Sequence, residues 1–386
     1  MLCGRENEIA EAMANCQAER HVVVSAEPGM GISSLFDAGL APALKRAGYI
    51  VVTHRDWQGA TFATNFMEAI AEAVREQADP RFLAQGEPLD EMLHCIRSHT
   101  GRRVALLLDQ FEDYIRCQAN SHQSDLFDAD LGRVVAHREA CVVIGLHAHA
   151  IPAFERLNQH VPNLLGFHIQ LQPLTVEAAE QAIRLEAASR SMEEVEPAAL
   201  EALLAAPVLT RQVNRVHPFF LKIATNRLLE AEYRTKSHAL RMSTINAFES
   251  VDRLVLESLD PIIQELSVTH QDLLFRWFNI LVSTDNEPLS VTEKGLNKYA
   301  GRLNRFVVTL LPALLEKGIL RTLRIKETLR YELGHEGYAP ILRDWWERRE
   351  GVIIARRRAV FRVTSISVAV GAILVIYIVW VIFGMK

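Results

Sequence analysis

Several common features are missing from this 386-residue chain, and each absence excludes a class of protein. There is no low-complexity segment and no repeat of 20–50 residues, which excludes solenoid and propeller arrays. The first 16 residues contain no apolar run, so we expect no secretory signal peptide. The five cysteines lack paired metal-binding spacing, and in the cytoplasmic chain that we expect they are predicted to remain reduced thiols.

An excess of positive charge is also missing. The formal net charge is −5, and 23% of the residues are charged. This composition is typical of two or three soluble domains, and it argues against a surface that coats nucleic acid.

A lysine is missing from a loop that otherwise predicts phosphate binding. Residues 21–25 form an apolar, β-branched run, and residues 33–46 have a helical pattern. Between them, Gly29 and Gly31 allow a tight turn whose backbone N–H groups can cradle an anion. Ser33 stands where a Mg²⁺-binding hydroxyl belongs, but Ile32 replaces the lysine that reaches the β- and γ-phosphates.

A second element is an apolar strand that ends in a carboxylate. Residues 104–108 precede Asp109, which is therefore expected at the carboxyl edge of a parallel sheet, where an acid of this type holds Mg²⁺. Glu112 or Asp113 is then the candidate for orienting a catalytic water. Alone, an apolar run that ends in an acid is a weak sign of a Mg²⁺ site. Its position at the expected distance after the phosphate loop makes the sign stronger.

Other cations are candidates for the missing charge. Lys45 and Arg46 lie on the same helix as Ser33 but roughly 18 Å along it, so we exclude them. Arg5, or an arginine from a neighbouring subunit, remains open. The alternative is that the loop is only a turn and that Ile32 packs against the sheet.

Four motifs resemble the novel STAND branch of P-loop NTPases. They are Gly4-Arg5-Glu6, the helix from Ser33 to Leu44, the segment from Asp109 to Asp113, and the segment from Tyr331 to Glu336 with Leu342 and Trp345 behind it. The resemblance covers most of residues 1–350. It implies a nucleotide-dependent switch that uses ATP or ADP with Mg²⁺, in a class that usually carries signalling or defence modules.

The resemblance also implies which residues contact the nucleotide. Ser33 and Asp109 would hold Mg²⁺, and a proline of the helical lid would pack near the base. The residues expected at the cofactor are Gly29, Met30, Gly31, Ile32, Ser33, Ser34 and Pro218.

Departures from the family pattern gather around this same cleft. Ala26 replaces the first loop glycine, Ile32 the lysine, and Val216 a glycine near the lid proline. His147 and His149 stand where the family typically has an arginine and an acid. We therefore expect hydrolysis to be lost and nucleotide binding to be weakened.

The chain is predicted to be α/β, with five segments. Alternating strand-like and helical runs indicate a parallel-sheet P-loop NTPase core over residues 1–165. Helices rich in Ala, Leu and Glu indicate a lid over 166–255. The remaining segments are a winged-helix-like domain over 256–350, a basic juxtamembrane linker over 351–362, and a transmembrane helix over 363–383.

The winged-helix prediction rests on three helices followed by a hairpin of residues 319–325 and 329–333. Such domains often bind DNA, and this one carries Arg302, Arg305, Arg321, Arg324 and Arg330. Acidic residues dilute this charge, and in the family the module more often packs on the NTPase core. We therefore expect packing and regard DNA as an unlikely partner.

Histidines of two segments have alternative roles. His147 and His149 place two imidazoles on one face of a strand, but no third metal ligand is identifiable, so we interpret them as structural. His335 and Glu336 belong either to the packing surface, with the histidine sensing a bound phosphate, or to an ordinary structural contact.

The transmembrane prediction rests on length and charge. Residues 363–383 are uncharged and almost wholly apolar, and as a helix they span about 31 Å, the thickness of a bilayer core. Four arginines precede this segment and only Lys386 follows it, so the positive-inside rule puts the large domain in the cytoplasm. We expect a tail-anchored, single-pass protein of the cell inner membrane.

Three functions follow from these patterns. The first is a membrane-anchored switch or pseudo-ATPase that signals to or recruits a protein partner, or a second copy of itself, in a bacterial stress response or phage defence. The second is an active ATPase completed by a cation from a neighbouring subunit. The third is a scaffold that does not depend on nucleotide.

Overall fold

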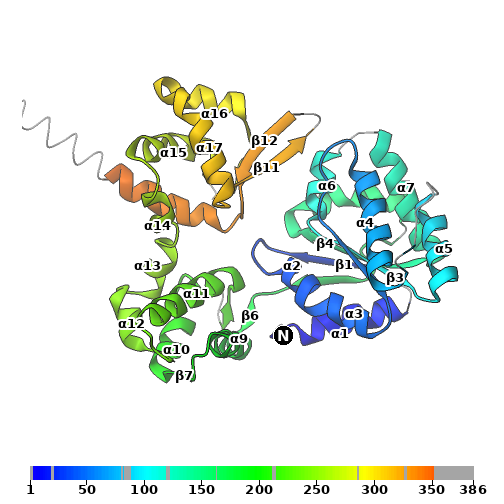
Figure 1. Ribbon diagram of the computed structural model, residues 1–386, viewed down its shortest axis with the longest axis horizontal. Coiled ribbons are helices and arrows are strands. Elements are labelled where there is room, and N and C mark those ends of the chain that lie inside the picture. Colours follow the sequence, from blue (N-terminus) through cyan, green and yellow to red (C-terminus); the bar gives the residue numbers. More distant parts are fainter. Residues whose placement is uncertain are drawn as a thin grey trace, which may run out of the picture.

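The computed structural model describes residues 3–18, 21–79, 81, 88–118, 122–161, 163–210, 214–284, 287–325 and 328–351. Figure 1 shows three units, which we call the α/β unit (residues 3–171), the helical unit (174–256) and the C-terminal unit (260–351). The predicted membrane segment 363–383 lies outside the described residues, as does all of the linker 351–362 except its first residue. In the described part of the chain, no helix combines the length and apolar character needed to cross a bilayer.

The α/β unit is built on a five-stranded sheet with the order β2-β3-β4-β1-β5, in which every neighbouring pair is parallel. This confirms the predicted parallel sheet. The strands are β1 (Val22–Ala26), β2 (Ile50–His54), β3 (Val104–Leu108), β4 (Ala140–His147) and β5 (His168–Leu171). Because β5 pairs with β1, the sheet extends past the predicted boundary at residue 165, and the α/β unit ends near residue 171.

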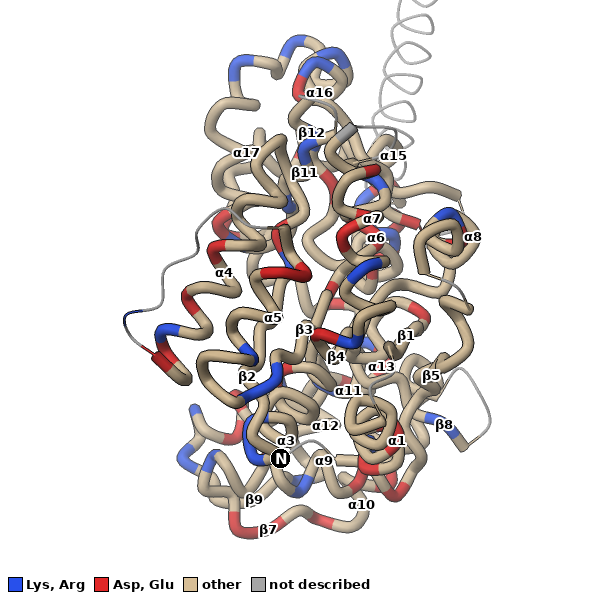
Figure 2. Tube along the Cα trace, turned by 90° about the vertical axis from the view of Figure 1, so that its right-hand side faces the viewer, with Lys and Arg blue, Asp and Glu red and all other residues tan. Residues whose placement is uncertain are grey.

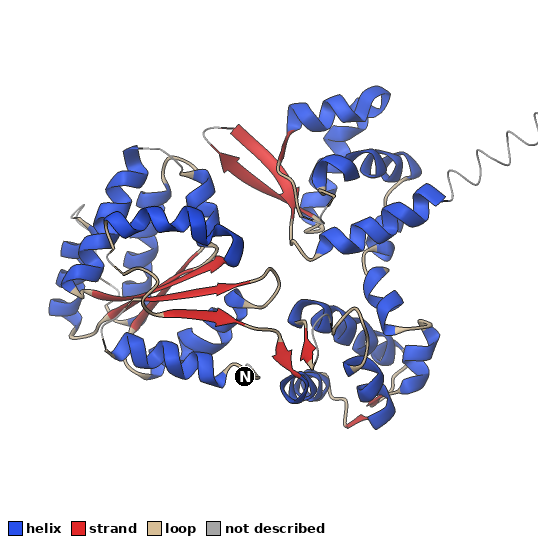
Figure 3. Ribbon diagram, turned by 180° about the vertical axis from the view of Figure 1, so that it is seen from behind, coloured by secondary structure: helices blue, strands red, loops and turns tan. Residues whose placement is uncertain are grey.

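Helices cover both faces of this sheet (Figure 3). Side chains alternate along each strand, so Val22 and Val24 pack in one apolar cluster and Val23 packs in the other. The helices are α1 (Glu6–Gln17), α2 (Ile32–Ser34), the π-helix η1 (Leu35–Leu40), α3 (Ala41–Arg46), α4 (Phe62–Gln77), α5 (Leu89–Thr100), α6 (Phe111–Cys117), α7 (His122–His137), η2 (Ala148–Ala150), α8 (Ile151–Phe154) and η3 (Glu155–Gln159).

A disulfide joins Cys16 of α1 to Cys141 of β4. Both residues are fully buried, and α1 packs on the sheet beside β4. The prediction that every cysteine is a separate thiol therefore does not hold for this pair, whose 125-residue sequence separation leaves no local signal of proximity.

The helical unit follows directly, and its helices lie within the range 166–255 or one residue beyond it, where the sequence predicts a helical lid. Its elements are β6 (Leu174–Thr175), α9 (Val176–Ser189), β7 (Glu194–Val195), α10 (Pro197–Leu204), β8 (Arg215–Val216), α11 (Pro218–Arg234), β9 (Ala239–Leu240), α12 (Met242–Ala247) and α13 (Val251–Leu256). One continuous cluster of buried apolar residues joins this unit to the C-terminal unit. The two units therefore share a core.

The C-terminal unit contains helices and a three-stranded sheet with the order β10-β12-β11. The predicted hairpin is confirmed, because β11 and β12 pair in antiparallel register with Leu320 opposite Leu333. A last helix covers residues 338–351. The other elements are α14 (Asp260–Gln264), α15 (Val268–Leu281), β10 (Val291–Thr292), α16 (Glu293–Ala300), η4 (Gly301–Phe306), α17 (Val307–Glu316), β11 (Leu320–Ile325) and β12 (Thr328–Leu333).

Candidate nucleotide site and its closure

The predicted phosphate loop has the backbone shape that its glycines require. It leaves β1 after Ala26 and enters α2 at Ile32, and α2, η1 and α3 continue without a break to residue 46. Gly29 and Gly31 have φ angles of 82° and 92°, in the left-handed region that glycine adopts without strain. The strand, turn and helix of a phosphate loop are therefore all present.

Loop residues predicted to contact the cofactor differ in their accessibility. Ser33 is half-buried and Ser34 is exposed, so both hydroxyls lie at or near the surface at the start of the helix. Met30 is buried and Gly31 is half-buried. Nucleotide contacts of these residues remain a prediction.

Ile32 packs against the sheet. The residue is only 8% exposed, and its Cγ2 lies 2.6 Å from the position that a Cβ would occupy on Gly145 of β4. The absence of a side chain on Gly145 therefore makes room for Ile32. This position supplies no charge to a phosphate.

Arg5, one of the candidate substitute cations, contacts the loop directly. Its guanidinium is buried, and Nη2 donates a hydrogen bond of 3.0 Å to the carbonyl oxygen of Met30. Its Nη1 donates to Glu8, also at 3.0 Å. Arg5 therefore binds the backbone of the phosphate loop through this hydrogen bond to Met30.

Asp109 lies at the carboxyl end of β3, as predicted, and is 1% exposed. Its Oδ2 accepts a hydrogen bond of 2.8 Å from Nε of Arg55, which also pairs with Asp37 at 2.6 Å. Its Oδ1 accepts from the backbone N–H of Gln110 at 3.0 Å. A buried carboxylate needs a positive partner, and here Arg55 provides it.

The residues present fit a Mg²⁺ ion at this edge. The hydroxyl of Ser33 and the carboxylate of Asp109 are hard oxygen donors of the kind that Mg²⁺ prefers. Since Arg55 is itself 40% exposed, it can move into solvent when another cation takes its place. Sequence reasoning missed Arg55 because β2 and β3 become neighbours only in the sheet.

The two candidate water-orienting acids, Glu112 and Asp113, lie in the first turn of α6 and are both buried. The backbone N–H of His147 donates to Glu112 at 3.2 Å, and Arg321 holds Asp113 through two hydrogen bonds of 2.8 and 3.2 Å. Burial raises the pKa of both carboxyl groups, against the lowering effect of their positive neighbours. In this arrangement both acids make contacts within the protein, and their catalytic role remains a prediction.

Asp113 belongs to an ion network between the α/β unit and the C-terminal unit. Arg321 of β11 also contacts Glu332 of β12 at 2.6 Å, and Arg116 of α6 contacts the same carboxylate at 2.6 Å. We call Asp113, Arg116, Arg321 and Glu332 the interface network. Both of its carboxylates are nearly inaccessible, at 2% and 4% exposure, so each depends on these arginines for its charge balance.

Gln58 adds a second link to the same hairpin. Its Nε2 donates to the carbonyl oxygen of Thr322, and its Oε1 accepts from the N–H of Arg324, both at 3.1 Å. Figure 1 shows the β11–β12 hairpin projecting from the C-terminal unit towards α6. The hairpin is therefore attached to the α/β unit by side chains and by its own backbone.

The start of α11 covers the loop at Gly29. A Cβ on Gly29 would lie 2.8 Å from Cε1 of His217 and 2.9 Å from Cβ of Phe219. The predicted base-contacting residue, Pro218, lies between them as the first residue of α11 and is half-buried. The helical unit thus reaches the phosphate loop.

Phe219 continues this contact to the C-terminal unit. Its ring stacks on His335 with a centroid distance of 3.9 Å and an interplanar angle of 7°. Burial lowers the pKa of His335 to about 4, so its ring is neutral at physiological pH. Phe219 of α11 therefore contacts both the phosphate loop and the turn after β12. In the sequence, this connection is marked only by an aromatic residue beside Pro218.

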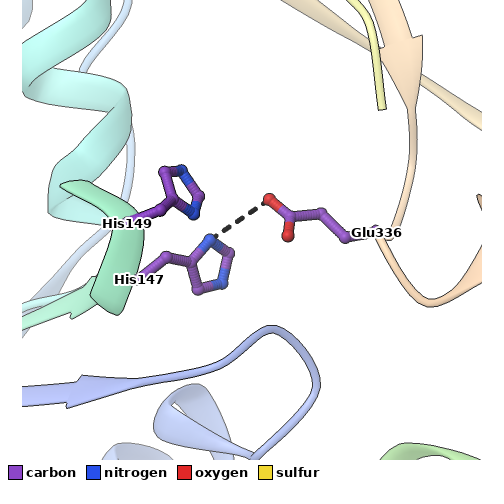
Figure 4. Close-up of side chains that lie close together, drawn as sticks. All are labelled: His147, His149 and Glu336. Atoms are coloured by element: carbon purple, nitrogen blue, oxygen red, sulfur yellow. Dashed lines mark ion pairs between the residues drawn. The ribbon is translucent and has the colours of Figure 1, made fainter. Parts of the chain in front are cut away.

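A group of histidines and carboxylates lies nearby (Figure 4). Nδ1 of His147 lies 3.3 Å from Oε1 of Glu112 and 3.3 Å from Oε1 of Glu336. Burial alone would lower the pKa of His147, but the carboxylate of Glu336, followed by that of Glu112, raises it to about 9. His147 ends β4 and His149 lies in η2, so the two are not on one strand as predicted, although their ring centroids are 5.6 Å apart.

Comparison with curated proteins finds no match. Among solved structures, the chain is similar to the Aeropyrum pernix ORC1 protein in complex with DNA, with a TM-score of 0.47, 14% identity, and coverage of 90% of this chain and 94% of that chain. It is also similar to the ADP form of the Aeropyrum pernix ORC2 protein, with a TM-score of 0.46, 14% identity, and coverage of 92% of this chain and 94% of that chain. The similarity to Cdc6p from Pyrobaculum aerophilum has a TM-score of 0.41, 14% identity, and coverage of 90% of this chain and 95% of that chain.

The family comparison covers nearly the whole chain. The family described as Novel STAND NTPase 1 matches residues 1–365. That range includes the phosphate loop, the parallel sheet around it and the C-terminal hairpin. The chain therefore belongs to the Novel STAND NTPase 1 family and is a STAND-type protein with the P-loop NTPase fold.

Proposed function

We propose that this protein is a nucleotide-responsive switch in a closed state, in which the C-terminal unit occupies the acidic edge of the nucleotide site. The observation that carries this proposal is the bidentate contact of Arg321 with Asp113. An acid expected to serve a bound nucleotide is held by an arginine 208 residues further along the chain. Opening of this contact would expose a surface for a partner or for a second copy of the chain.

Contacts at the loop support coupling between the nucleotide and this closed state. A phosphate cradled at Gly29 would compete for space with His217 and Phe219, and Phe219 is stacked on His335 of the C-terminal unit. Displacement of Phe219 would therefore remove a contact that holds the C-terminal unit. A ligand shifts such an equilibrium only by binding the open state more tightly.

Binding without efficient hydrolysis fits the residues that remain. The loop N–H groups would hold phosphate, and Ser33 with Asp109 would hold Mg²⁺, which would neutralise phosphate charge when bound. Ile32 adds no cation, and both candidate acids are engaged in contacts. We therefore assign the protein as a pseudo-ATPase switch.

Titration of the purified full chain with Mg·ATP tests this function. We expect weak binding and no turnover above background in the natural chain. In Ile32→Lys, a charged hydrogen bond to phosphate contributes about 1.5–3 kcal/mol, so affinity should rise about 10- to 100-fold. Ile32→Met keeps an apolar side chain without adding charge, and its affinity should match that of the natural chain.

Each other outcome of this titration supports a different function. Turnover by the natural chain would favour an active ATPase completed by a neighbouring subunit. No binding by either the natural chain or Ile32→Lys would favour a nucleotide-independent scaffold, which the burial of Ile32 against Gly145 also favours. Equal binding by Ile32→Lys and Ile32→Met would show that position 32 does not face phosphate.

We assign the C-terminal unit as a winged helix that packs on the α/β unit and does not bind DNA. The helices α15, α16 and α17, followed by the antiparallel hairpin of β11 and β12, support this assignment. Arg321 is committed to the interface network, and Arg330 donates to the side chain and backbone of Ser290. Figure 2 shows acidic and basic residues mixed over most of the chain, with basic residues grouped only near α16.

We also propose that residues 363–383 anchor the protein in the inner membrane, with the α/β unit in the cytoplasm. Reporter enzymes fused in turn to each terminus test this topology. The N-terminal fusion should be active only in the cytoplasm, and the fusion after Lys386 only outside it, because the arginines before the segment resist translocation. A cytoplasmic signal from both fusions would contradict the anchor.

A further inference from the structure

We propose that His147, His149 and Glu336 form a binding site for a divalent transition metal of the zinc type, which ties the α/β unit to the C-terminal unit. Each offers one ligand atom, and these atoms all lie within 4.8 Å of one another. Figure 4 shows the two imidazoles on one side and the carboxylate approaching from the other. The third ligand comes from a residue 187 positions after His149 in the sequence.

The donor set selects the kind of metal. Two imidazole nitrogens and one carboxylate oxygen are a ligand set that binds zinc, with a fourth position left for water. Ligand atoms around a tetrahedral zinc lie about 3.4 Å apart, given bonds of about 2.0–2.1 Å. His149 is exposed and Glu336 is half-buried, so rotation of these side chains can shorten the present separations.

The position of a buried imidazole nitrogen provides the second observation. Nδ1 of His147 is inaccessible to solvent, and within the described part of the chain it has no partner with hydrogen-bond geometry. It nevertheless lies 3.3 Å from carboxylate oxygens of both Glu112 and Glu336. A metal ion at this nitrogen would satisfy it and would lie beside two carboxylates of opposite charge.

Metal binding at this place would favour the closed arrangement. His147 and His149 belong to the α/β unit, and Glu336 follows β12 of the C-terminal unit. All three ligands are together only while the two units are in contact. Since a metal stabilises the state that binds it, the ion would strengthen the same interface that Arg321 holds.

The test uses the full chain, purified in mild detergent, stripped with a chelator and titrated with Co²⁺ or Zn²⁺ in the absence of nucleotide. We expect one equivalent of Co²⁺ to give the visible absorption of a four-coordinate site with nitrogen and oxygen ligands. Zn²⁺ should displace it and raise the melting temperature. His149→Ala and Glu336→Gln should each weaken metal binding by at least about tenfold.

A matched control separates this site from other histidines. His94 of α5 is also exposed and also lies beside one carboxylate, that of Glu139. Both of these residues belong to the α/β unit, so they do not join it to the C-terminal unit. His94→Ala should bind the metal like the natural chain. Because His149 is exposed, His149→Ala is expected to fold normally, which its circular dichroism spectrum checks.

Two results would overturn the proposal. One is the absence of saturable binding by the natural chain, which would leave His147 as an ion-pair partner only. The other is unchanged affinity in both His149→Ala and Glu336→Gln, which would put the metal elsewhere, for example on the cysteines. Neither result bears on nucleotide binding, which the Mg·ATP titration measures separately.

Discussion

Replacing Arg321 with alanine is expected to release the β11–β12 hairpin from α6. The substitution removes one of the two arginines that contact the nearly inaccessible carboxylates of Asp113 and Glu332, and it leaves only Arg116 beside them. Removing one partner of a buried ion pair costs about 3–5 kcal/mol; we expect about 3 kcal/mol, because Arg321 is partly exposed. Hydrogen exchange of the backbone amides of β11 should then accelerate about 100-fold.

Two further variants make the Arg321 experiment specific. Arg324→Ala removes an exposed arginine from the same strand and should leave the exchange rates near those of the natural chain. Adding Asp113→Asn and Glu332→Gln to Arg321→Ala removes the two negative charges that Arg116 alone would otherwise balance, and it should recover part of the protection. If the backbone amides of β11 exchange as slowly in Arg321→Ala as in Arg324→Ala, the interface network does not hold the closed state.

Release of the hairpin should also affect nucleotide binding. If the C-terminal unit restricts the site, Arg321→Ala should bind Mg·ATP more tightly than the natural chain, because less of the binding energy is used to open the interface. Unchanged affinity together with faster exchange would mean that the interface and the nucleotide site are not coupled.

Gly145→Ala is expected to destabilise the α/β unit by about 1–3 kcal/mol, the usual range for adding a methyl group to a filled core. The new Cβ would lie 2.6 Å from Cγ2 of Ile32 and 2.9 Å from Cζ of Phe36, and both side chains are buried. Hydrogen exchange of β1 and β4 amides measures the effect. The loss of stability alone does not separate the contact with Ile32 from the contact with Phe36.

A double-mutant cycle isolates the contact between these two residues. Ile32→Ala removes Cγ2 and makes space for the added methyl group, so the double variant should be more stable than the sum of the single changes predicts, by about 1 kcal/mol. Leu40→Ala, a change of a buried residue in the same helical segment, should be additive with Gly145→Ala. Additivity in both cycles would place Ile32 away from Gly145.

Much of the fold could be predicted because its signals are local. A β-branched run predicts β1, an apolar run predicts β3, and the acid that follows this run predicts where Asp109 lies. Two runs that lie close together in the chain, residues 319–325 and 329–333, predict the pair of β11 and β12. Each of these signals depends on residues within one element or on its immediate flanks.

Partners across the sheet and between the units could not be predicted in the same way. Arg55 reaches Asp109 because β2 lies beside β3, and Arg321 reaches Asp113 because a hairpin of a different unit packs on α6. Neither arginine has a local pattern that distinguishes it from other arginines of the chain. The disulfide between Cys16 and Cys141 is a third contact of this kind.

From the sequence alone, this chain has a phosphate loop with its glycines and a serine but without its lysine, because turn geometry and residue chemistry can be read locally. The tertiary structure decided that Ile32 packs on Gly145, that Asp113 is held by Arg321, and that Glu336 joins the two histidines. The physical reason is that burial and charge pairing depend on which distant surfaces meet. Backbone periodicity does not encode that choice.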